Sequence, residues 1–262
     1  MLAHRIVGAF VFLLVLLAAL HRWAWLGQVM RQPRVLGAFL VSAVLLSINW
    51  LAYIWSVANG HVVDASLGYF MTPLVNTALG YTVLHERLRR PQAVALGLAT
   101  CGVAWLTLLT SHPPWIALVL AGSFGVYGLL RKVATLGALE GLTLETLILV
   151  PAAVAGLWFL QSSGRAVFPS ADPAANLWLA IVGPVTAVPL LLFAAGARRL
   201  PMATLGILQY LSPTLQFLLG VWLFHEPFSA QRLVGFCLIW AALLLYTADA
   251  WRVARRLGAT PA

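Results

Sequence analysis

The sequence predicts an all-α integral membrane protein, a polytopic bundle of transmembrane helices. Hydrophobic residues make up 62% of the 262 positions, mean hydropathy is +0.93, and only 9% of residues are charged. A soluble protein needs far more charge than this to cover its surface. The apolar residues form continuous runs near the ~20 residues that cross the hydrocarbon as a helix. They do not alternate with the period of two that is typical of a transmembrane β-barrel.

Nine apolar runs, separated by prolines and charged residues, predict nine transmembrane helices. Several tryptophans, including Trp23, Trp115 and Trp251, lie at the ends of these runs, where an amphipathic ring prefers the membrane interface. No connection is long enough to hold a soluble domain. The predicted spans are 3–20, 35–58, 62–84, 92–110, 114–130, 142–160, 175–197, 201–224 and 233–250.

The basic residues predict the topology of the chain. Thirteen of the 16 lysines and arginines fall in one set of alternate connections and three in the other. The larger set is Arg22, Arg31, Arg34, Arg87, Arg89, Arg90, Arg131, Lys132, Arg198, Arg199, Arg252, Arg255 and Arg256, and the smaller set is Arg5, Arg165 and Arg232. The positive-inside rule then puts the C-terminus in the cytoplasm and, with nine spans, Met1 outside. We therefore expect a multi-pass protein of the bacterial inner (plasma) membrane, embedded in the lipid bilayer.

The net charge of +9 does not indicate a nucleic-acid partner. The basic residues occur singly or in pairs and triplets between apolar runs, with no long basic tract, so membrane topology accounts for them.

An internal repeat relates the two halves of the chain. Residues 69–76 (YFMTPLVN) match residues 209–216 (QYLSPTLQ), and at the same offset His85-Glu86 match His225-Glu226. A repeat with an odd number of spans gives two copies of opposite orientation, a hallmark of transporter folds. We expect a first repeat of four spans over 1–110, a second of five spans over 111–250, and a short basic cytoplasmic tail over 251–262.

Several motifs distributed over residues 3 to about 249 carry a resemblance to a known family. They are AHR at 3–5, NWLAYIW at 49–55, NGH at 59–61, ASLGYF at 65–70, PLVN at 73–76, ERL at 86–88, SFGVYGLLRK at 123–132, GLTLET at 141–146 and LGILQYLSPTLQF at 205–217. The chain resembles the EamA branch of the drug/metabolite transporter superfamily, most closely its RarD type, which is associated by name with chloramphenicol sensitivity. The resemblance implies ten helices in two inverted five-helix repeats. Because this chain starts inside what resembles the second helix, we expect one native helix to be missing.

Two polar stripes at equivalent positions of the repeat are the main candidates for a substrate cavity. Each stripe falls on one helical face at i, i+4, i+7 and i+11, with a proline inside it. The stripes are Tyr69, Pro73, Asn76 and Gly80 in the first copy, and Gln209, Pro213, Gln216 and Gly220 in the second. Buried amides at membrane depth are costly unless partnered, so the stripes predict either a cavity lined by both repeats or hydrogen bonds between helices.

Further candidates lie in other spans. Asn49 and Tyr53 share a face of the span 35–58 with Ser42 and Ser56, and Tyr127 lies one turn from a serine in the span 114–130. Each of these sets predicts either a further cavity wall or a structural hydrogen bond between helices. Glu145, near the start of the span 142–160, could carry a proton during transport or favour the positive end of its helix.

Other classes of function find little support in the sequence. Neither copy of the His-Glu pair continues to a second histidine at i+4, so no HExxH metal site is formed, and no nucleotide-binding GxxxxGK[ST] or hydrolase GxSxG motif occurs. We expect no enzyme activity, no cofactor and no metal.

The predicted function is secondary transport of a small-molecule substrate, a metabolite or drug, by an exporter or facilitator. The alternative is a non-transporting membrane sensor or assembly factor, and after it a membrane-embedded enzyme. Ala93, Gly97 and Cys101 form a small-residue stripe that predicts close helix packing or a homodimer face.

Overall fold

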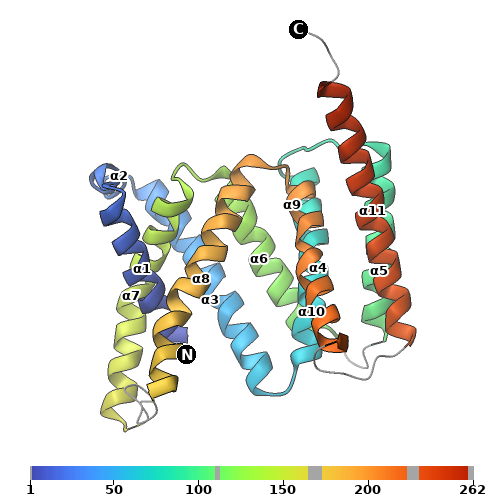
Figure 1. Cartoon of the computed structure of the whole chain (residues 1–262). Coiled ribbons are helices and arrows are strands. Elements are labelled where there is room, and N and C mark those ends of the chain that lie inside the picture. The colour runs from blue at the N-terminus through green and yellow to red at the C-terminus, as the bar shows by residue number, and fades with distance from the viewer. Residues whose placement is uncertain (1, 110–112, 165–172, 223–229, 259–262) are drawn as a thin grey trace. The chain divides into compact units, whose positions relative to one another are not determined.

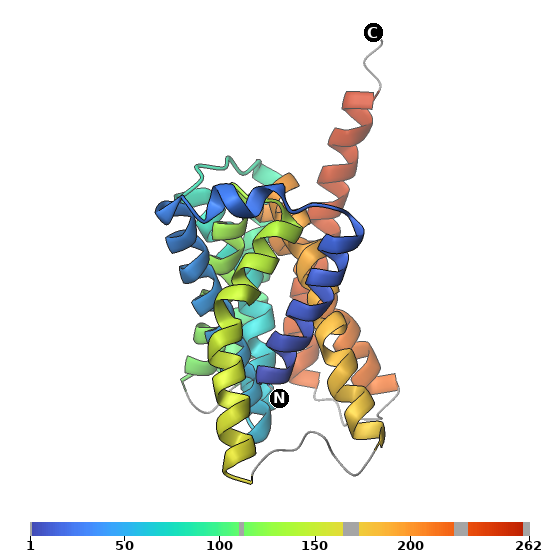
Figure 2. The same ribbon diagram turned by 90° about the vertical axis from the view of Figure 1, so that its left-hand side faces the viewer.

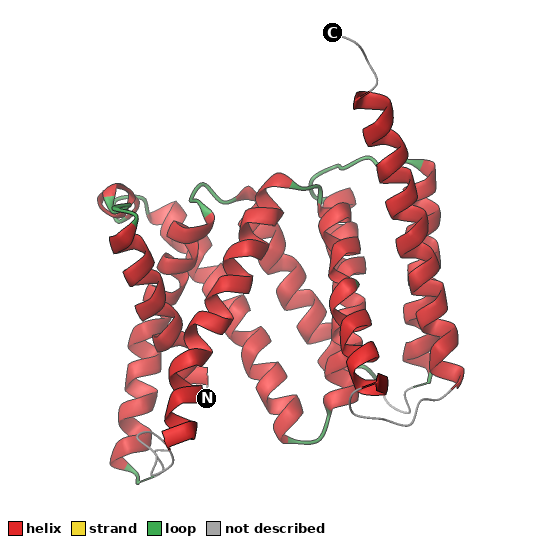
Figure 3. Cartoon of the chain, in the orientation of Figure 1, coloured by secondary structure: helices red, strands yellow, loops and turns green. Residues whose placement is uncertain are grey.

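The computed structural model describes residues 2–109, 113–164, 173–222 and 230–258, and within these ranges the regular structure is entirely helical (Figures 1 and 3). The helices are α1 (Leu2–Ala19), α2 (Ala24–Val29), α3 (Pro33–Ala58), α4 (Val62–Thr82), α5 (Arg90–Leu108), α6 (Trp115–Val133), α7 (Ala138–Ser162), α8 (Pro173–Arg199), α9 (Met202–Gln209), α10 (Leu211–Trp222) and α11 (Ala230–Gly258). The prediction of an all-α membrane protein is confirmed.

Each of the nine predicted spans falls on helix, but the spans differ in character. Seven helices of the described residues are long and apolar enough to cross a membrane: α1, α3, α5, α6, α7, α8 and α11. Helix α4 has 21 residues but is more polar. Helices α9 and α10 have only 8 and 12 residues, short of the ~20 that a straight crossing needs. The number nine therefore remains a prediction, and the short helix α2 was not predicted.

The chain divides into two compact units, and each draws on both halves of the sequence. Unit 1 contains Met1–Ile54 and Leu130–Arg199, and unit 2 contains Trp55–Leu129 and Leu200–Ala262. The helices α3 and α6 pass from one unit to the other near their ends.

In unit 1, helix α1 packs against both α7 and α8 (Figure 2). Glycines allow the close approach of α1 and α8. A Cβ atom added at Gly183 would collide with the backbone of Gly8, so a larger residue at position 183 would force the helices apart. Small residues at such contacts are how membrane helices gain van der Waals packing where lipid supplies no hydrophobic drive.

In unit 2, helix α5 runs beside α11, and α4 packs against α9 (Figure 1). The α5–α11 contact again uses glycine, because a Cβ at Gly102 would lie 2.8 Å from the carbonyl oxygen of Gly235. Buried aromatic and aliphatic side chains, among them Phe70 and Phe236 in edge-to-face contact, complete the core. The predicted stripe Ala93, Gly97 and Cys101 is exposed on α5, so the packing against α11 uses a neighbouring face.

The two copies of the repeated proline segment differ in continuity. Pro73 lies inside the unbroken helix α4, whereas the predicted span 201–224 is divided at Tyr210, so that Pro213 falls in the first turn of α10. Proline is tolerated in a first turn because its missing N–H would have no helical partner there. The hydroxyl of Thr214 donates to the carbonyl oxygen of Tyr210 at 2.8 Å, which satisfies the backbone at the break.

Candidate functional site

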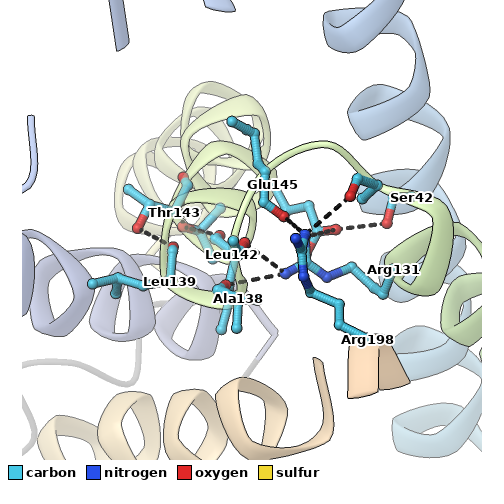
Figure 4. A network of polar contacts seen from close by, with 12 residues as sticks. Ser42, Arg131, Ala138, Leu139, Leu142, Thr143, Glu145 and Arg198 are labelled. Atoms are coloured by element: carbon cyan, nitrogen blue, oxygen red, sulfur yellow. Dashed lines mark hydrogen bonds and ion pairs between the residues drawn. The ribbon is translucent and has the colours of Figure 1, made fainter. Parts of the chain in front are cut away.

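The α6–α7 hairpin of unit 1 places a buried arginine against a buried glutamate. Arg131 lies in the last turn of α6, and Glu145 lies two turns into α7. The four-residue connection 134–137 joins α6 to α7, and the two side chains converge next to it (Figure 4). The first-turn acidic residue of α7 is Glu140, because the helix begins at Ala138, four residues earlier than the predicted span.

Both charged side chains are 0% exposed, and a serine of α3 joins them. The Nη1 atom of Arg131 lies 3.6 Å from Oε1 of Glu145, and the Ser42 hydroxyl donates to the same oxygen at 2.6 Å. The Arg131 guanidinium also lies over the Phe39 ring at 5.5 Å, a cation–π contact. Three helices, α3, α6 and α7, thus meet at one ion pair (Figure 4).

Two carbonyl oxygens tie the guanidinium to the α6–α7 turn. Nη2 of Arg131 donates to the carbonyls of Gly137 at 3.2 Å and Ala138 at 3.1 Å. Glycine at position 141 makes room for the head group, because a Cβ there would fall on Nη1. From α8, Arg198 (labelled in Figure 4) donates to the carbonyls of Ala134 and Leu136, and these bonds fix the same turn.

The Arg131 guanidinium nevertheless keeps unused hydrogen-bonding capacity. Its Nε and Nη1 atoms are buried and have no hydrogen-bond acceptor among the described residues, since the 3.6 Å approach of Nη1 to Glu145 is an ion pair without a hydrogen bond. A buried donor left unpaired costs about 1–3 kcal/mol, and more when it is charged. Such a group calls for a specific explanation.

A cavity of about 240 Å³ opens beside this arginine. It is lined by Arg34, Val35, Ala38, Phe39, Ser42, Leu130, Arg131, Val133, Ala134 and Thr135. Most of these side chains are apolar, and the two arginines supply the charge. Mostly apolar walls with a few convergent polar groups are the usual make-up of a small-molecule site.

Unit 2 contains a second buried polar contact, between two of the predicted site residues. The Asn76 side-chain amide of α4 donates to Oε1 of Gln209, at the end of α9, at 2.5 Å. The helices are close here because Gly206 packs on the backbone of Pro73. Asn76 is 0% exposed.

The remaining predicted site residues lie apart from these two contacts. Asn49 and Tyr53 are half-buried on α3, with both residues in unit 1. Tyr69 is exposed on α4, and Tyr127 is fully buried in α6, where its ring lies 5.6 Å from that of Phe124. The side chain of Gln216 lies outside the described residues.

Comparison with known proteins shows the family. The model of the EamA-like transporter family matches residues 1–108 and again 113–248. The chain belongs to the EamA-like transporter family. It is thus a multi-pass membrane protein of a transporter family, and the resemblance seen in its sequence motifs is confirmed.

Relatives of this EamA-like chain include proteins named RarD. It is 48% identical to "Protein RarD" of Streptomyces exfoliatus over 97% of this chain and 81% of the relative. "Protein RarD" of Escherichia coli K12 is 42% identical over 97% and 86%, and the "Uncharacterized transporter YojE" of Bacillus subtilis 168 is 45% identical over 94% and 83%. A crystal structure that covers 95% of the chain, with 86% of its own length matched, has a TM-score of 0.69 at 20% identity, which shows a shared fold.

Sequence reasoning on this EamA-like chain found Glu145 but missed its partner. Arg131 was interpreted only as one of many cytoplasmic charges, and Ser42 as a member of a polar stripe. The available signal was spacing: an arginine in the last turn of one helix and a glutamate two turns into the next both lie near the short turn that joins the helices.

Proposed function

We propose that the protein is a secondary transporter of small metabolites or drugs in the bacterial inner membrane. It works as an exporter or facilitator, by alternating access between two inverted repeats. The buried Arg131–Glu145 pair beside a cavity is the observation that carries the proposal, because ionisable groups inside membrane helices mark transport pathways by default. The two successive matches of the family model support the two-repeat arrangement.

Glu145 is the proposed site of proton coupling. Its carboxylate faces Arg131 from α6 and Ser42 from α3, and Arg34 lines the same cavity as Arg131 and Ser42. Protonation of Glu145 would release the arginine from its counter-ion, and loss of the proton would restore the pair. A charge that alternates in this way is the element that a proton-driven cycle requires.

Asn76, Gln209 and Gln216 are the proposed polar groups of the transport pathway in the repeated proline segments, with Asn49, Tyr53, Tyr69 and Tyr127 as further cavity residues. The Asn76–Gln209 hydrogen bond supports a role for the first pair, and it is also what helix packing alone would produce. Flux measurements separate these two interpretations.

The decisive experiment is flux into proteoliposomes containing the purified protein, with a panel of candidate solutes and an imposed pH gradient. We expect saturable flux that loses its dependence on the gradient in Glu145→Gln and falls in Asn76→Leu and Gln216→Leu. Ala104→Leu, at an exposed position of α5, is the matched control and should transport normally. The absence of flux for every solute would favour the sensor or assembly factor.

Topology is tested by fusing phosphatase or green fluorescent protein to the C-terminus. The basic tail predicts fluorescence without phosphatase activity, since a cytoplasmic C-terminus follows from the positive-inside rule. Strong phosphatase activity would reverse the topology and place the Arg131 cavity at the opposite end of the transport path.

A further inference from the structure

We propose that the cavity beside Arg131 binds the carboxylate group of a small solute with an apolar body. Arg131 binds the carboxylate of the solute, and the Glu145 carboxylate competes with the solute for Arg131. The ligand is assigned by the chemistry of three features: an incompletely satisfied guanidinium, the wall of the cavity, and the carboxylate already present.

The hydrogen bonds that hold the guanidinium in place use only one of its three nitrogen atoms. Nη2 is occupied by the Gly137 and Ala138 carbonyls, whereas Nε and Nη1 have no hydrogen-bond acceptor among the described residues. Arg131 lines the cavity, and because its Nε and Nη1 atoms are themselves buried, a ligand reaches them only by displacing the Glu145 carboxylate from the guanidinium. Arginine pairs strongly with planar oxyanions, and a charged acceptor recovers the cost of burying its N–H groups.

The cavity wall selects what the carboxylate is attached to. Val35, Ala38, Phe39 and Leu130 offer an apolar surface, while Arg34 adds a second positive charge. At ~30 Å³ of liquid volume per water molecule, about 240 Å³ corresponds to the space of about eight water molecules, enough for a small organic acid. An aromatic or branched aliphatic acid of that size suits the site, and a strongly polar solute does not.

Glu145 explains how the site stays closed to other anions. With the cavity empty, its carboxylate neutralises Arg131 from 3.6 Å, and Ser42 holds it there. An entering carboxylate takes over the neutralising charge and weakens the hold of Glu145 on the arginine. Binding of the solute and the state of Glu145 are therefore coupled, and the coupling is reciprocal.

This inference rests on the proposed function in one respect, that the bound acid is the transported solute. Binding itself is measured without flux. A protein that binds the acid but transports nothing would refute the proposed function alone. A protein that transports solutes without preferring acids at this site would refute the inference alone.

The test uses 4-fluorobenzoate as the probe, with binding read from ¹⁹F line broadening on the purified full chain in phosphatidylcholine nanodiscs. The neutral isostere 4-fluorobenzamide is the control ligand. We expect saturable binding of the acid and none of the amide. Affinity for the acid should fall about tenfold or more in Arg131→Gln, the loss expected for a charge-assisted hydrogen bond.

Ala38→Leu fills the cavity while leaving every contact of Arg131 in place, so it tests the site separately from the folding of Arg131→Gln. Ala38→Leu should weaken the binding of 4-fluorobenzoate as much as Arg131→Gln does, whereas Ala104→Leu should leave it unchanged. Equal binding of acid and amide, or an unchanged affinity in Ala38→Leu, would overturn the proposal.

Glu145→Gln gives the opposite result, because it removes the competing negative charge and keeps the shape. We expect about tenfold tighter binding of 4-fluorobenzoate. Weaker binding in this variant would contradict the competitor role. Loss of binding when phosphatidylglycerol is added to the nanodiscs would assign the cavity to an anionic lipid head group instead.

Discussion

The Arg131–Glu145–Ser42 contact of unit 1 and the Asn76–Gln209 contact of unit 2 both join helices through buried polar side chains. The first involves opposite charges, and a cavity opens beside it. The second involves two neutral amides 2.5 Å apart, at a place where glycine brings the helices into close contact.

The difference separates a charged contact beside a cavity from a neutral contact between closely packed helices. Each leaves a buried polar atom without a hydrogen-bond partner among the described residues: Nε and Nη1 of Arg131 in the charged contact, and Oδ1 of Asn76 in the neutral one. The amide pair needs no further group to bring its two helices together. The ion pair gains little net stability, because the cost of taking two charges out of water offsets their attraction. A buried pair that contributes little to folding, and keeps two donor atoms without acceptors in a residue that lines a cavity, is better explained by what it binds.

The largest expected effect comes from breaking the ion pair. Arg131→Met leaves the Glu145 carboxylate buried without its counter-ion, which should lower the free energy of unfolding by about 3–5 kcal/mol. Reversible unfolding of the protein and of Arg131→Met in mixed micelles measures this difference in the free energy of unfolding.

The double variant Arg131→Met/Glu145→Leu sharpens the comparison. Removing both charges should recover most of the unfolding free energy that Arg131→Met loses. A deficit of about 1–3 kcal/mol should remain, because the carbonyls of Gly137 and Ala138 lose their donor. Stability would return without any binding of 4-fluorobenzoate. Single variants that each cost less than about 1 kcal/mol would show that the pair is solvated.

The sequence predicts some parts of this molecule better than others, for physical reasons. Helix positions follow from the length of apolar runs, which the bilayer dictates, so all nine predicted ranges fall on helix. The break at Tyr210 was missed because the same proline spacing gives a continuous helix in α4. The two copies also differ at an equivalent position: Thr77 donates to the Pro73 carbonyl in α4, whereas residue 217 is phenylalanine, which has no hydroxyl to donate.

The two candidate contacts show the same limit. Asn76 and Gln209 stood out because amides are rare in apolar helices, although nothing in the sequence showed that they bond to each other. Arg131 did not stand out, because an arginine at the end of a transmembrane helix is normally explained by the positive-inside rule. Its burial depends on Gly141 and Phe39, residues of two other helices whose proximity only the fold reveals.

The next largest effect tests the close packing beneath the amide pair. Gly206→Ala would place a Cβ 2.7 Å from the carbonyl oxygen of Pro73, so α9 must move away from α4. We expect a loss of about 1–3 kcal/mol in unfolding free energy, as for overpacked cores. Gly97→Ala is the matched control, because a Cβ there meets nothing within 4 Å and should not destabilise the protein. Equal effects of the two substitutions would mean that α4 and α9 are not in close contact.

The smallest expected effect is the coupling energy of the amide pair itself. Hydrogen bonds between membrane helices average about 0.6 kcal/mol in double-mutant cycles and reach about 1.7. A cycle of Asn76→Leu, Gln209→Leu and the double variant should therefore give a coupling of about 0.5–1.5 kcal/mol in unfolding free energy.

Measured flux in the same variants distinguishes a packing role of the two amides from a role in transport. If the pair only packs helices, flux per folded molecule should be the same in all three variants, since stability alone would change. If the amides serve the transported solute, flux should fall in each single variant, and the double variant should not recover it. A coupling energy near zero would contradict the hydrogen bond and leave the two amides as independent groups.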